Sequence, residues 1–523
     1  MSLLEIQLSL PLLLIFGLIL ILVLIDAFTS RDSKANYILS IVGLVVVTIA
    51  ACYDLFIYPN LYVIGKIDAI SISTFFSKNM LRFGGYTAAF DALFAISGVL
   101  TLFLSRDYFK KTYSEHKEIY SILLCSIFGM MIISHANHLI VLFLGIEAMS
   151  IPFYVLTGYI RTRESSVEGA LKYFFLGAFS TGFLLYGISM IYGSTGTFYY
   201  NEIHNIILNF SEYPMYLKLG LGLSSVGILF KVAAFPFHQW APDVYHSAPT
   251  PFSGFLSTAG KAAAIVAFIG LFLTVAPYDT TNILVSDLNI GMQFLIAVIA
   301  AATMIIGNVT ALAQKNIKRM LSYSSVGHAG YLLMGIVSNN PEGFSGMLYY
   351  SIAYMLTQIG AFAVLSVLEG AKEENLMLDD FSGLSKKQPV LALVMAMFMF
   401  SLAGIPPFAG FFGKYYLFKA AIGAGFTWLT IVAVLTSIIS VFYYLSVIVK
   451  MYFTESMSNS NNIQYINNKS TDKDKEQKVY INNNNLAPAK LYLSKVTLLS
   501  TAIGILVFGI FSYLVINYSE MLF

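Results

Sequence analysis

The stretch LFKVAAFPFHQWAPDVYHSAPTP, residues 229–251, places Lys231 inside an apolar run that Pro236 interrupts five residues later. A proline has no backbone N–H, so the carbonyl of Val232, four residues earlier, loses its helical hydrogen-bond partner. In a membrane, such a carbonyl is tolerated only where protein or water satisfies it. A charged lysine at membrane depth is also costly and usually marks a function. The stretch therefore predicts a broken membrane helix with a hydrated, charged centre.

The composition of the chain indicates a protein embedded in a membrane. Of its 523 residues, 57% are hydrophobic and 11% are charged, whereas a soluble domain carries about 25% charged residues. We count about fourteen apolar segments that are long enough to cross a bilayer, and we predict an all-α polytopic membrane protein in contact with lipid. The predicted transmembrane helices are residues 8–28, 36–57, 83–104, 119–134, 139–160, 169–192, 217–240, 252–274, 291–312, 320–338, 343–368, 389–417, 428–452 and 495–518.

The sequence disfavours a nucleic-acid partner and a redox centre in this chain. It has no basic cluster with interleaved aromatic residues. The two cysteines, Cys52 and Cys125, are too few for an iron–sulfur cluster and lie in separate apolar runs. We therefore expect this chain to bind no metal and no cofactor.

Lysine and arginine residues are concentrated in the loops on one side of the membrane. If the N-terminus lies outside, the inner loops hold most of them, including Arg106, Arg163 and Lys318. Cytoplasmic loops are enriched in such residues, so we expect both termini on the outer, periplasmic side. The Asn-rich segment 454–494 has almost no apolar content, and we expect a polar inner loop without chemistry there.

A weak internal repeat divides the chain. Glu147–Tyr173 lies 177 positions ahead of Ser324–Tyr350, and five residues coincide at that offset. The offset spans five predicted helices, an odd number, so two repeated units would have opposite orientations in the membrane. The predicted regions are a three-helix region at 1–118, five-helix units at 119–285 and 286–453, the polar loop at 454–494 and a C-terminal helix at 495–523.

A second proline break lies in GIPPFAGFFGK, where Pro406 and Pro407 free the carbonyls of Leu402 and Ala403. This break falls in the twelfth predicted helix, and the break at Pro236 falls in the seventh. Pro236 and Pro406 are 170 positions apart in the sequence, which is close to the repeat offset of 177. We therefore expect helices 7 and 12 to be discontinuous.

Four lysines fall inside apolar runs, and these are Lys172, Lys231, Lys261 and Lys414. Lys172 lies near the inner boundary and can extend its ammonium group to the surface. The other three are deep in their helices. Glu147 is also deep, because it lies eight residues, roughly 12 Å, beyond the predicted helix start at Leu139.

One deep acid and three deep lysines predict a proton relay. Burial favours the neutral amine of a lysine and a nearby carboxylate favours its ammonium form, so a lysine under both influences can exchange protons. Structural ion pairs are the alternative for these charges. His328, in SYSSVGHAGYLLMG, is a further candidate, either as a member of the relay or as a hydrogen-bond donor between helices.

Four stretches together carry a resemblance to a known family. They are LFLGIEAMSIPFYVLTGY, FKVAAFPFHQWAPDVYHSAPTPFSGFLSTAGKAAA, NVTALAQKNIKRMLSYSSVGHAGYLLMG and GIPPFAGFFGKYYLF. The sequence resembles the antiporter-like membrane subunits of respiratory complex I, the NADH-quinone oxidoreductase. Among them, the APDVY…APTP form favours subunit N over its two larger relatives. The likeness is strong over residues 119–452.

The resemblance implies a fourteen-helix fold with two inverted five-helix units and discontinuous helices 7 and 12. It also implies that Glu147 tunes Lys231, that Lys261 is the central relay, and that Lys414 passes protons towards a half-channel or a neighbouring subunit. Many relatives have proline before the central lysine, where this chain has Gly260. The local shape around Lys261 is therefore an open question at this stage.

The resemblance further implies partners and a location. NADH, FMN, iron–sulfur clusters and quinone would bind to other membrane and peripheral subunits of the complex. The chain would lie in the inner, cytoplasmic membrane, or in an organelle inner membrane if it is organelle-encoded. Two alternatives remain: a subunit of a Mrp-type cation/proton antiporter or membrane-bound hydrogenase of the same fold, and a structural membrane subunit without a transport role.

Overall fold

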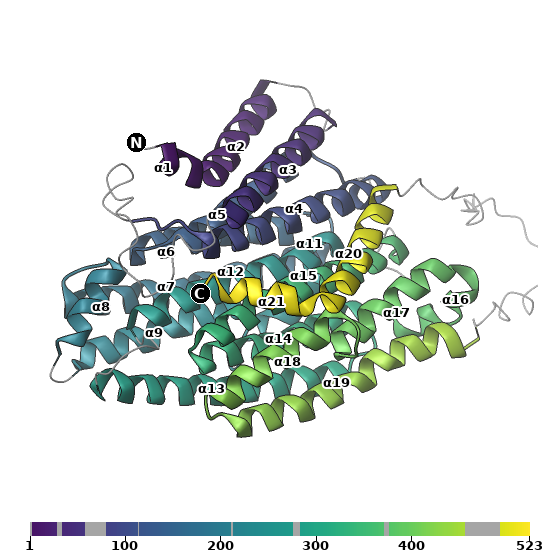
Figure 1. Cartoon of the computed structure of the whole chain (residues 1–523). Helices are drawn as coiled ribbons and strands as arrows, with labels where there is room; N and C mark the ends of the chain where they lie inside the picture. Colours follow the sequence, from purple (N-terminus) through teal and green to yellow (C-terminus); the bar gives the residue numbers. More distant parts are fainter. Residues whose placement is uncertain are drawn as a thin grey trace, which may run out of the picture.

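The fold consists of helices that pack side by side in one elongated bundle (Figure 1). A computed structural model describes residues 3–28, 34–57, 80–112, 114–210, 213–275, 283–370, 376–455 and 492–523. In these ranges there are three isolated β-bridges and no β-strand. The predicted all-α fold is therefore confirmed.

The first half of the chain supplies the helices from α1 to α12. They are α1 (Leu3–Leu8), α2 (Leu10–Phe28), α3 (Lys34–Ile57), α4 (Gly85–Thr112), α5 (Glu118–His135), α6 (Leu139–Thr157), α7 (Glu164–Thr195), α8 (Tyr200–Leu208), α9 (Met215–Val232), α10 (Trp240–Ser247), α11 (Thr250–Phe255), the π-helix η1 (Leu256–Gly260) and α12 (Lys261–Val275).

The second half supplies the remaining helices. They are α13 (Ile283–Leu312), α14 (Ile317–Ser338), α15 (Pro341–Leu368), the 3₁₀ helix η2 (Leu378–Phe381), α16 (Leu384–Lys387), α17 (Pro389–Ala403), α18 (Ala409–Gly423), α19 (Thr427–Phe453), α20 (Tyr492–Ile510) and α21 (Ser512–Glu520). The last two cross the bundle and pack on α15, and α20 also packs on α18 (Figure 1).

The membrane-spanning helices agree with the predicted ones. Twelve helical stretches in the described ranges are long and apolar enough to cross a membrane. The tenth predicted helix corresponds to α14, and the twelfth corresponds to α17 followed by α18. The predicted polar loop at 454–494 lies almost wholly outside the described residues. The division into five regions and the side of the membrane on which the termini lie stay predictions.

Two helices are interrupted at the predicted prolines. The seventh ends as α9 at Val232 and resumes as α10 at Trp240, and the twelfth ends as α17 at Ala403 and resumes as α18 at Ala409. Both first halves are closed by a residue in the left-handed region, Ala233 with φ 63° and Gly404 with φ 83°. Such a cap satisfies carbonyls at the end of a helix. The discontinuous helices 7 and 12 are thus confirmed.

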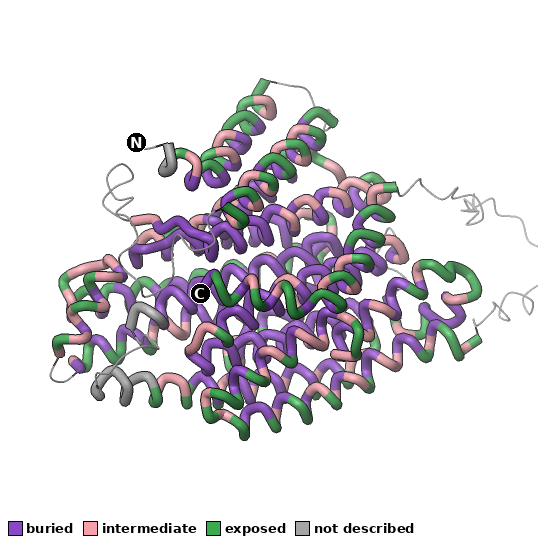
Figure 2. The backbone as a smooth tube through the Cα atoms, viewed as in Figure 1, coloured by how far each residue is buried: buried purple, intermediate pink, exposed green. Residues whose placement is uncertain are grey.

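A third irregularity lies in the eighth helix and was not predicted from the sequence. The π-helix Leu256–Gly260 separates α11 from α12 and ends directly before Lys261. Short π segments inside α-helices frequently occur at functional sites. The window Thr250–Phe272 is also buried along its whole length, so this helix forms the centre of the bundle (Figure 2).

Two helix pairs approach each other closely at glycines. A Cβ atom on Gly129 of α5 would lie 2.3 Å from the backbone nitrogen of Met149 on α6, and one on Gly307 of α13 would lie 2.3 Å from that of Gly327 on α14. The two glycines, and the two residues that they approach, are each 178 positions apart. This offset is one position larger than the 177 predicted from the sequence, and it pairs Glu147 with Ser325 instead of Ser324.

Candidate functional site

The three deep lysines of the sequence prediction are buried in the bundle. Lys231 is 5% exposed, Lys261 is 1% exposed and Lys414 is 4% exposed. Lys172 differs, because its side chain is 44% exposed and its Nζ lies 2.7 Å from Glu168 and 3.3 Å from Asp243. The structure therefore assigns Lys172 to surface ion pairs and leaves three lysines in the interior.

Lys231 lies in the last turn of α9, just before the break. Its Nζ donates to Ser150 Oγ at 2.8 Å and to Tyr154 Oη at 3.3 Å, both on α6. The ammonium also lies 5.8 Å from the ring centre of Tyr173, within the range of a cation–π contact. Hydroxyls and aromatic faces thus hold this charge directly.

Glu147 lies on the same face of α6, three residues before Ser150. It acts electrostatically on Lys231 from beyond the hydrogen-bonded shell. Glu147 is half-buried, and its Oε1 atom has no hydrogen-bond partner among the described residues. The structure therefore brings the predicted carboxylate near the first lysine without a direct ion pair between the two.

Lys261 is the first residue after the π-helix and points to α14. Its Nζ donates to the carbonyl of Ser325 and, at 2.6 Å, to Ser325 Oγ. Its neighbour Gly260 faces Phe153, whose Cε2 atom would lie 2.6 Å from an added Cβ. Glycine therefore lets the eighth helix approach α6 at this point, which accounts for the absence of a larger residue before the lysine.

Lys414 of α18 reaches back to the break in its own helix. Its Nζ donates to the carbonyls of Leu402 at 2.9 Å and Ala403 at 3.2 Å, and to Ser437 Oγ at 2.9 Å. The two carbonyls are the ones that the sequence predicts to be free. The ammonium also faces the ring of Tyr331 at 5.0 Å.

His328 lies between the second and third lysines. Its Nδ1 contacts Tyr350 Oη, and its Nε2 lies 3.1 Å from Tyr444 Oη. Both Lys261 and Lys414 are close enough to act on its charge. The ring of Tyr354, which also faces Lys261 at 5.8 Å, lies 4.7 Å from the histidine ring.

Sequence reasoning missed the hydroxyls that surround the four charges. Tyrosines and serines from five helices contact the lysines or His328, and these are Ser150, Tyr154, Tyr173, Ser325, Tyr331, Tyr350, Tyr354, Ser437 and Tyr444. Among 34 tyrosines, no spacing singles these out. Ser150 is the one hydroxyl that the sequence could have indicated, because its spacing of three residues from Glu147 places both on one helix face.

The broken helices and the row of buried lysines define the class of antiporter-like membrane subunits. A family model described as "NADH:quinone oxidoreductase/Mrp antiporter, TM" matches residues 136–440. Within that class, the chain belongs to the family of NADH-quinone oxidoreductase subunit N. It is 40% identical over 446 residues to that subunit (subunit N 1) from Chloroherpeton thalassium, with 85% of this chain and 89% of the relative covered. Over 365 residues it is 46% identical to the subunit from Trichlorobacter lovleyi, with 70% and 73% covered.

Solved structures show the same fold. A chain of respiratory complex I from Thermus thermophilus matches with a TM-score of 0.73 and 27% identity, covering 97% of this chain and 98% of that one. A chain of the Mrp complex from a Dietzia species matches with a TM-score of 0.81 and 19% identity, covering 100% and 97%. The second likeness shows the fold alone, whereas the curated relatives favour subunit N over an antiporter or hydrogenase subunit. The chain is thus a multi-pass membrane subunit of an oxidoreductase complex.

Proposed function

We propose that this chain translocates protons within a respiratory NADH:quinone oxidoreductase. Glu147, Lys231, Lys261, His328 and Lys414 carry the protons, and quinone reduction in other subunits drives the transfer. NADH, FMN, iron–sulfur clusters and quinone bind to those partners, so this chain contributes no redox centre. The complex lies in the cytoplasmic membrane, with both termini of this chain on the outer side.

One observation carries this proposal: Lys231, Lys261 and Lys414 each lie at, or bind to, an interruption of a membrane helix. Lys231 precedes the first break, Lys261 follows the π-helix, and Lys414 binds the carbonyls that the second break frees. Irregular backbone at membrane depth is tolerated where protein or water satisfies its polar groups. A lysine that only tied two helices together would not need such a position in all three cases.

The ligands of the lysines support proton exchange. In the described ranges, Lys261 and Lys414 have neutral oxygens and tyrosine rings as partners, and no carboxylate acts on either of them. Burial favours the neutral amine, while oxygen acceptors favour the ammonium form. Neither form is locked by an ion pair, so either lysine can gain or lose a proton.

Tyrosines connect the charges along the bundle. Tyr173 near Lys231 stacks on Trp240 at 4.4 Å, the Trp240 ring lies 5.6 Å from that of Tyr245, and Tyr245 is within electrostatic range of Tyr354 near Lys261. From Lys261, the row continues through Ser325 and Tyr354 to His328, and from there through Tyr350 and Tyr331 to Lys414. Water between these groups would complete the path for protons.

The test compares Lys261→Arg with Lys261→Ala in membranes that contain the whole complex. Arginine keeps the positive charge and does not release its proton, so both variants should lose proton pumping to a similar degree. Pumping is followed with a pH-sensitive dye in inside-out vesicles, alongside the rate of NADH:quinone reduction. Lys172→Arg is the matched control, because Lys172 only forms surface ion pairs.

The alternatives give different results. A structural cation at position 261 would be rescued by arginine, and pumping near the wild-type rate in Lys261→Arg would overturn the relay. A stand-alone antiporter would show sodium-dependent exchange without co-purifying flavin or iron–sulfur protein, which would contradict the assignment to an NADH:quinone oxidoreductase.

A further inference from the structure

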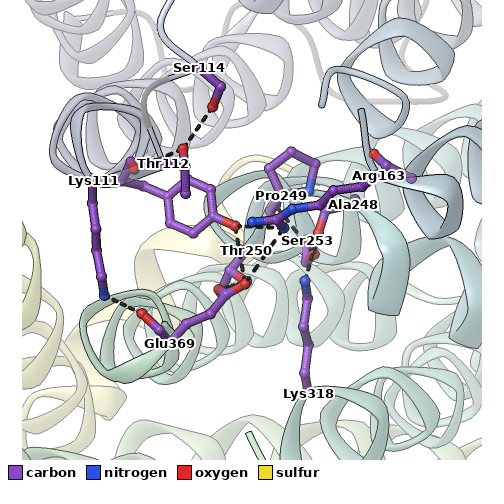
Figure 3. Close-up of polar contacts among 12 residues, drawn as sticks. Lys111, Thr112, Ser114, Arg163, Ala248, Pro249, Thr250, Ser253, Lys318 and Glu369 are labelled. Carbon is purple, nitrogen blue, oxygen red and sulfur yellow. Dashed lines mark hydrogen bonds and ion pairs between the residues drawn. The ribbon is translucent and has the colours of Figure 1, made fainter. Parts of the chain in front are cut away.

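Figure 3 shows a second cluster of polar groups, which includes none of Lys231, Lys261 and Lys414. It forms where α4, the α6–α7 loop, the α10–α11 loop, α14 and α15 meet, on the side of the membrane that the loop charges predict to be the inner side. Its members are Tyr108, Lys111, Arg163, Thr250, Lys318 and Glu369. None of them belongs to the relay described above.

The carboxylate of Glu369 is at the centre of this cluster, and the residue is 0% exposed. Its Oε1 atom accepts a hydrogen bond from Tyr108 Oη at 3.1 Å, and its Oε2 atom accepts one from Thr250 Oγ1. Arg163 Nη1 lies 3.9 Å from Oε1, and the Arg163 side chain is 15% exposed. Only the Arg163 side chain therefore separates this carboxylate from the surface of the protein.

A row of hydroxyls leads from Glu369 to Lys261. Thr250 begins the eighth helix, and Ser253 and Ser257 follow at spacings of three and four residues, with Lys261 four residues further on. In α11 this spacing places Thr250 and Ser253 on one side of the helix, and Ser257 and Lys261 continue the series through the π-helix. All three hydroxyl residues are 0% exposed, so the row runs through the centre of the bundle.

The spacing of this row suits a chain of single water molecules. One turn of helix rises about 5.4 Å, and two hydrogen bonds of about 2.8 Å span nearly the same distance. One water between each pair of hydroxyls would therefore connect Thr250 with Ser253 and Ser257, and further water would have to join Ser257 to the Lys261 amine, which lies against Ser325.

The buried acids in the described ranges are Asp54, Asp91 and Glu369. Asp54 and Asp91 lie on α3 and α4, and Asp91 is bound to His135 at 2.8 Å. Glu369 alone of these three contacts the eighth helix, which carries Lys261. A buried carboxylate is costly, so its presence calls for a reason. A role at the start of this row of hydroxyls supplies one, whereas a contact that only joins two helices does not need a charged group.

We propose that Glu369 is the group through which protons reach Lys261 from the inner side of the membrane. This rests on the proposed function, because it assigns the source of the protons that Lys261 transfers. A hydronium ion at the inner surface gives its proton to the Glu369 carboxylate and leaves as water. The acid then gives a proton to Thr250, the hydroxyls and waters each pass one on, and the Lys261 amine becomes an ammonium while the carboxylate is restored.

The charged and titratable groups that face Glu369 come from several segments. They are Tyr108 and Lys111 on α4, Arg163 in the α6–α7 loop and His246 on α10, and Lys318 on α14 faces His246 in turn. Lys111 binds the backbone carbonyls of Glu369 and Val367, and Lys318 binds that of Ala248 at 2.7 Å. The two lysines thus also fix the backbone at this end of the row.

The test uses inside-out vesicles with the whole complex, in which the inner side faces the medium and its pH can be set. Glu369→Gln removes the proton-carrying group, so we expect the proton-transfer step to slow by about tenfold or more. The loss should deepen as the pH of the medium rises, because fewer protons are then available to the remaining path. Glu369→Asp should keep most of the rate. Glu342→Gln is the matched control, since Glu342 begins the same helix at its opposite end and is half-exposed in an ion pair with Lys419.

Arg163→Gln separates proton transfer from a structural ion pair. It breaks the same contact as Glu369→Gln but leaves the acid in place, so we expect pumping to continue with an altered pH profile. If Arg163→Gln and Glu369→Gln cause equal, pH-independent losses, the cluster is only an ion pair and the inference fails. Pumping by Glu369→Gln at the rate of Glu342→Gln overturns it as well.

A second position covers the case in which Glu369→Gln prevents assembly. Thr250→Val keeps the shape of the side chain and removes the hydroxyl, whereas Thr250→Ser retains the hydroxyl. Slow pumping in Thr250→Val with recovery in Thr250→Ser supports the path, and normal pumping in an assembled Thr250→Val complex overturns it. Failure of this inference is distinct from failure of the proposed function, because the latter is decided by Lys261→Arg.

Discussion

Gly129→Ala should damage the site without touching any of its charged residues. An added Cβ would lie 2.3 Å from the Met149 nitrogen and 2.6 Å from the Ala148 carbonyl carbon, whereas real Cβ contacts essentially never fall under 3.0 Å. The backbones of α5 and α6 must therefore separate by about 0.7 Å or more. Overpacking of a core costs about 1–3 kcal/mol, and backbone atoms cannot move aside as a flexible side chain can.

The same displacement reaches the site through the chain. Ser150 follows Met149 directly, and its Oγ lies 2.8 Å from Lys231 Nζ. The limit for a hydrogen bond is about 3.5 Å, so a shift of about 0.7 Å would lengthen the Ser150–Lys231 hydrogen bond to that limit. We therefore expect lower thermal stability of the complex together with reduced proton pumping.

The assay measures assembly by native electrophoresis, the melting temperature of the purified complex, and pumping in vesicles. Gly182→Ala is the matched control, because a Cβ there meets nothing within 4 Å and alanine is the better helix former. If Gly129→Ala assembles, melts and pumps like Gly182→Ala, the close approach of α5 and α6 does not position the site.

Three further predictions concern the charges and the polar loop. Glu147→Asp should reduce pumping less than Glu147→Gln, because the carboxylate acts on Lys231 through its charge rather than through a direct bond; the reverse order of pumping rates would indicate a packing role. Lys231→Ala should depress pumping with assembly mostly intact, and full pumping would remove Lys231 from the relay. Deletion within Thr454–Lys490 should leave pumping and assembly unchanged, because its composition buries little apolar surface; a block in assembly on native gels would show that the segment docks on a partner.

The sequence allowed prediction of the broken helices because proline acts locally. The absence of one N–H fixes which carbonyls are free, and Leu402 and Ala403 are the carbonyls that Lys414 binds. The burial of the three lysines followed from the length of the apolar runs around them. Both inferences depend on a few neighbouring residues, and both agree with the structure.

The partners of these groups depend on contacts between distant segments and could not be predicted in the same way. Lys261 binds Ser325, 64 residues away, and Glu369 accepts hydrogen bonds from Tyr108 and Thr250, 261 and 119 residues away. At the sequence level, Glu369 is an acid at the end of an apolar run, where exposure to water is the ordinary expectation. The π-helix before Lys261 likewise has no local signal, since Leu256–Gly260 contains no proline.

In the predicted repeat, equivalent positions of the two units carry different chemistry. The shift of 178 positions that relates Gly129 to Gly307 and Met149 to Gly327 also relates Glu147 to Ser325. In the first unit this position carries a half-buried carboxylate that acts on Lys231 from a distance. In the second it carries a buried hydroxyl that binds Lys261 directly. A charged partner and a neutral partner stabilise an ammonium group to different extents, so these two positions give Lys231 and Lys261, which both lie in the predicted unit 119–285, unequal surroundings. In the proposed relay, an inequality of this kind would give a row of otherwise similar amines a direction for proton transfer.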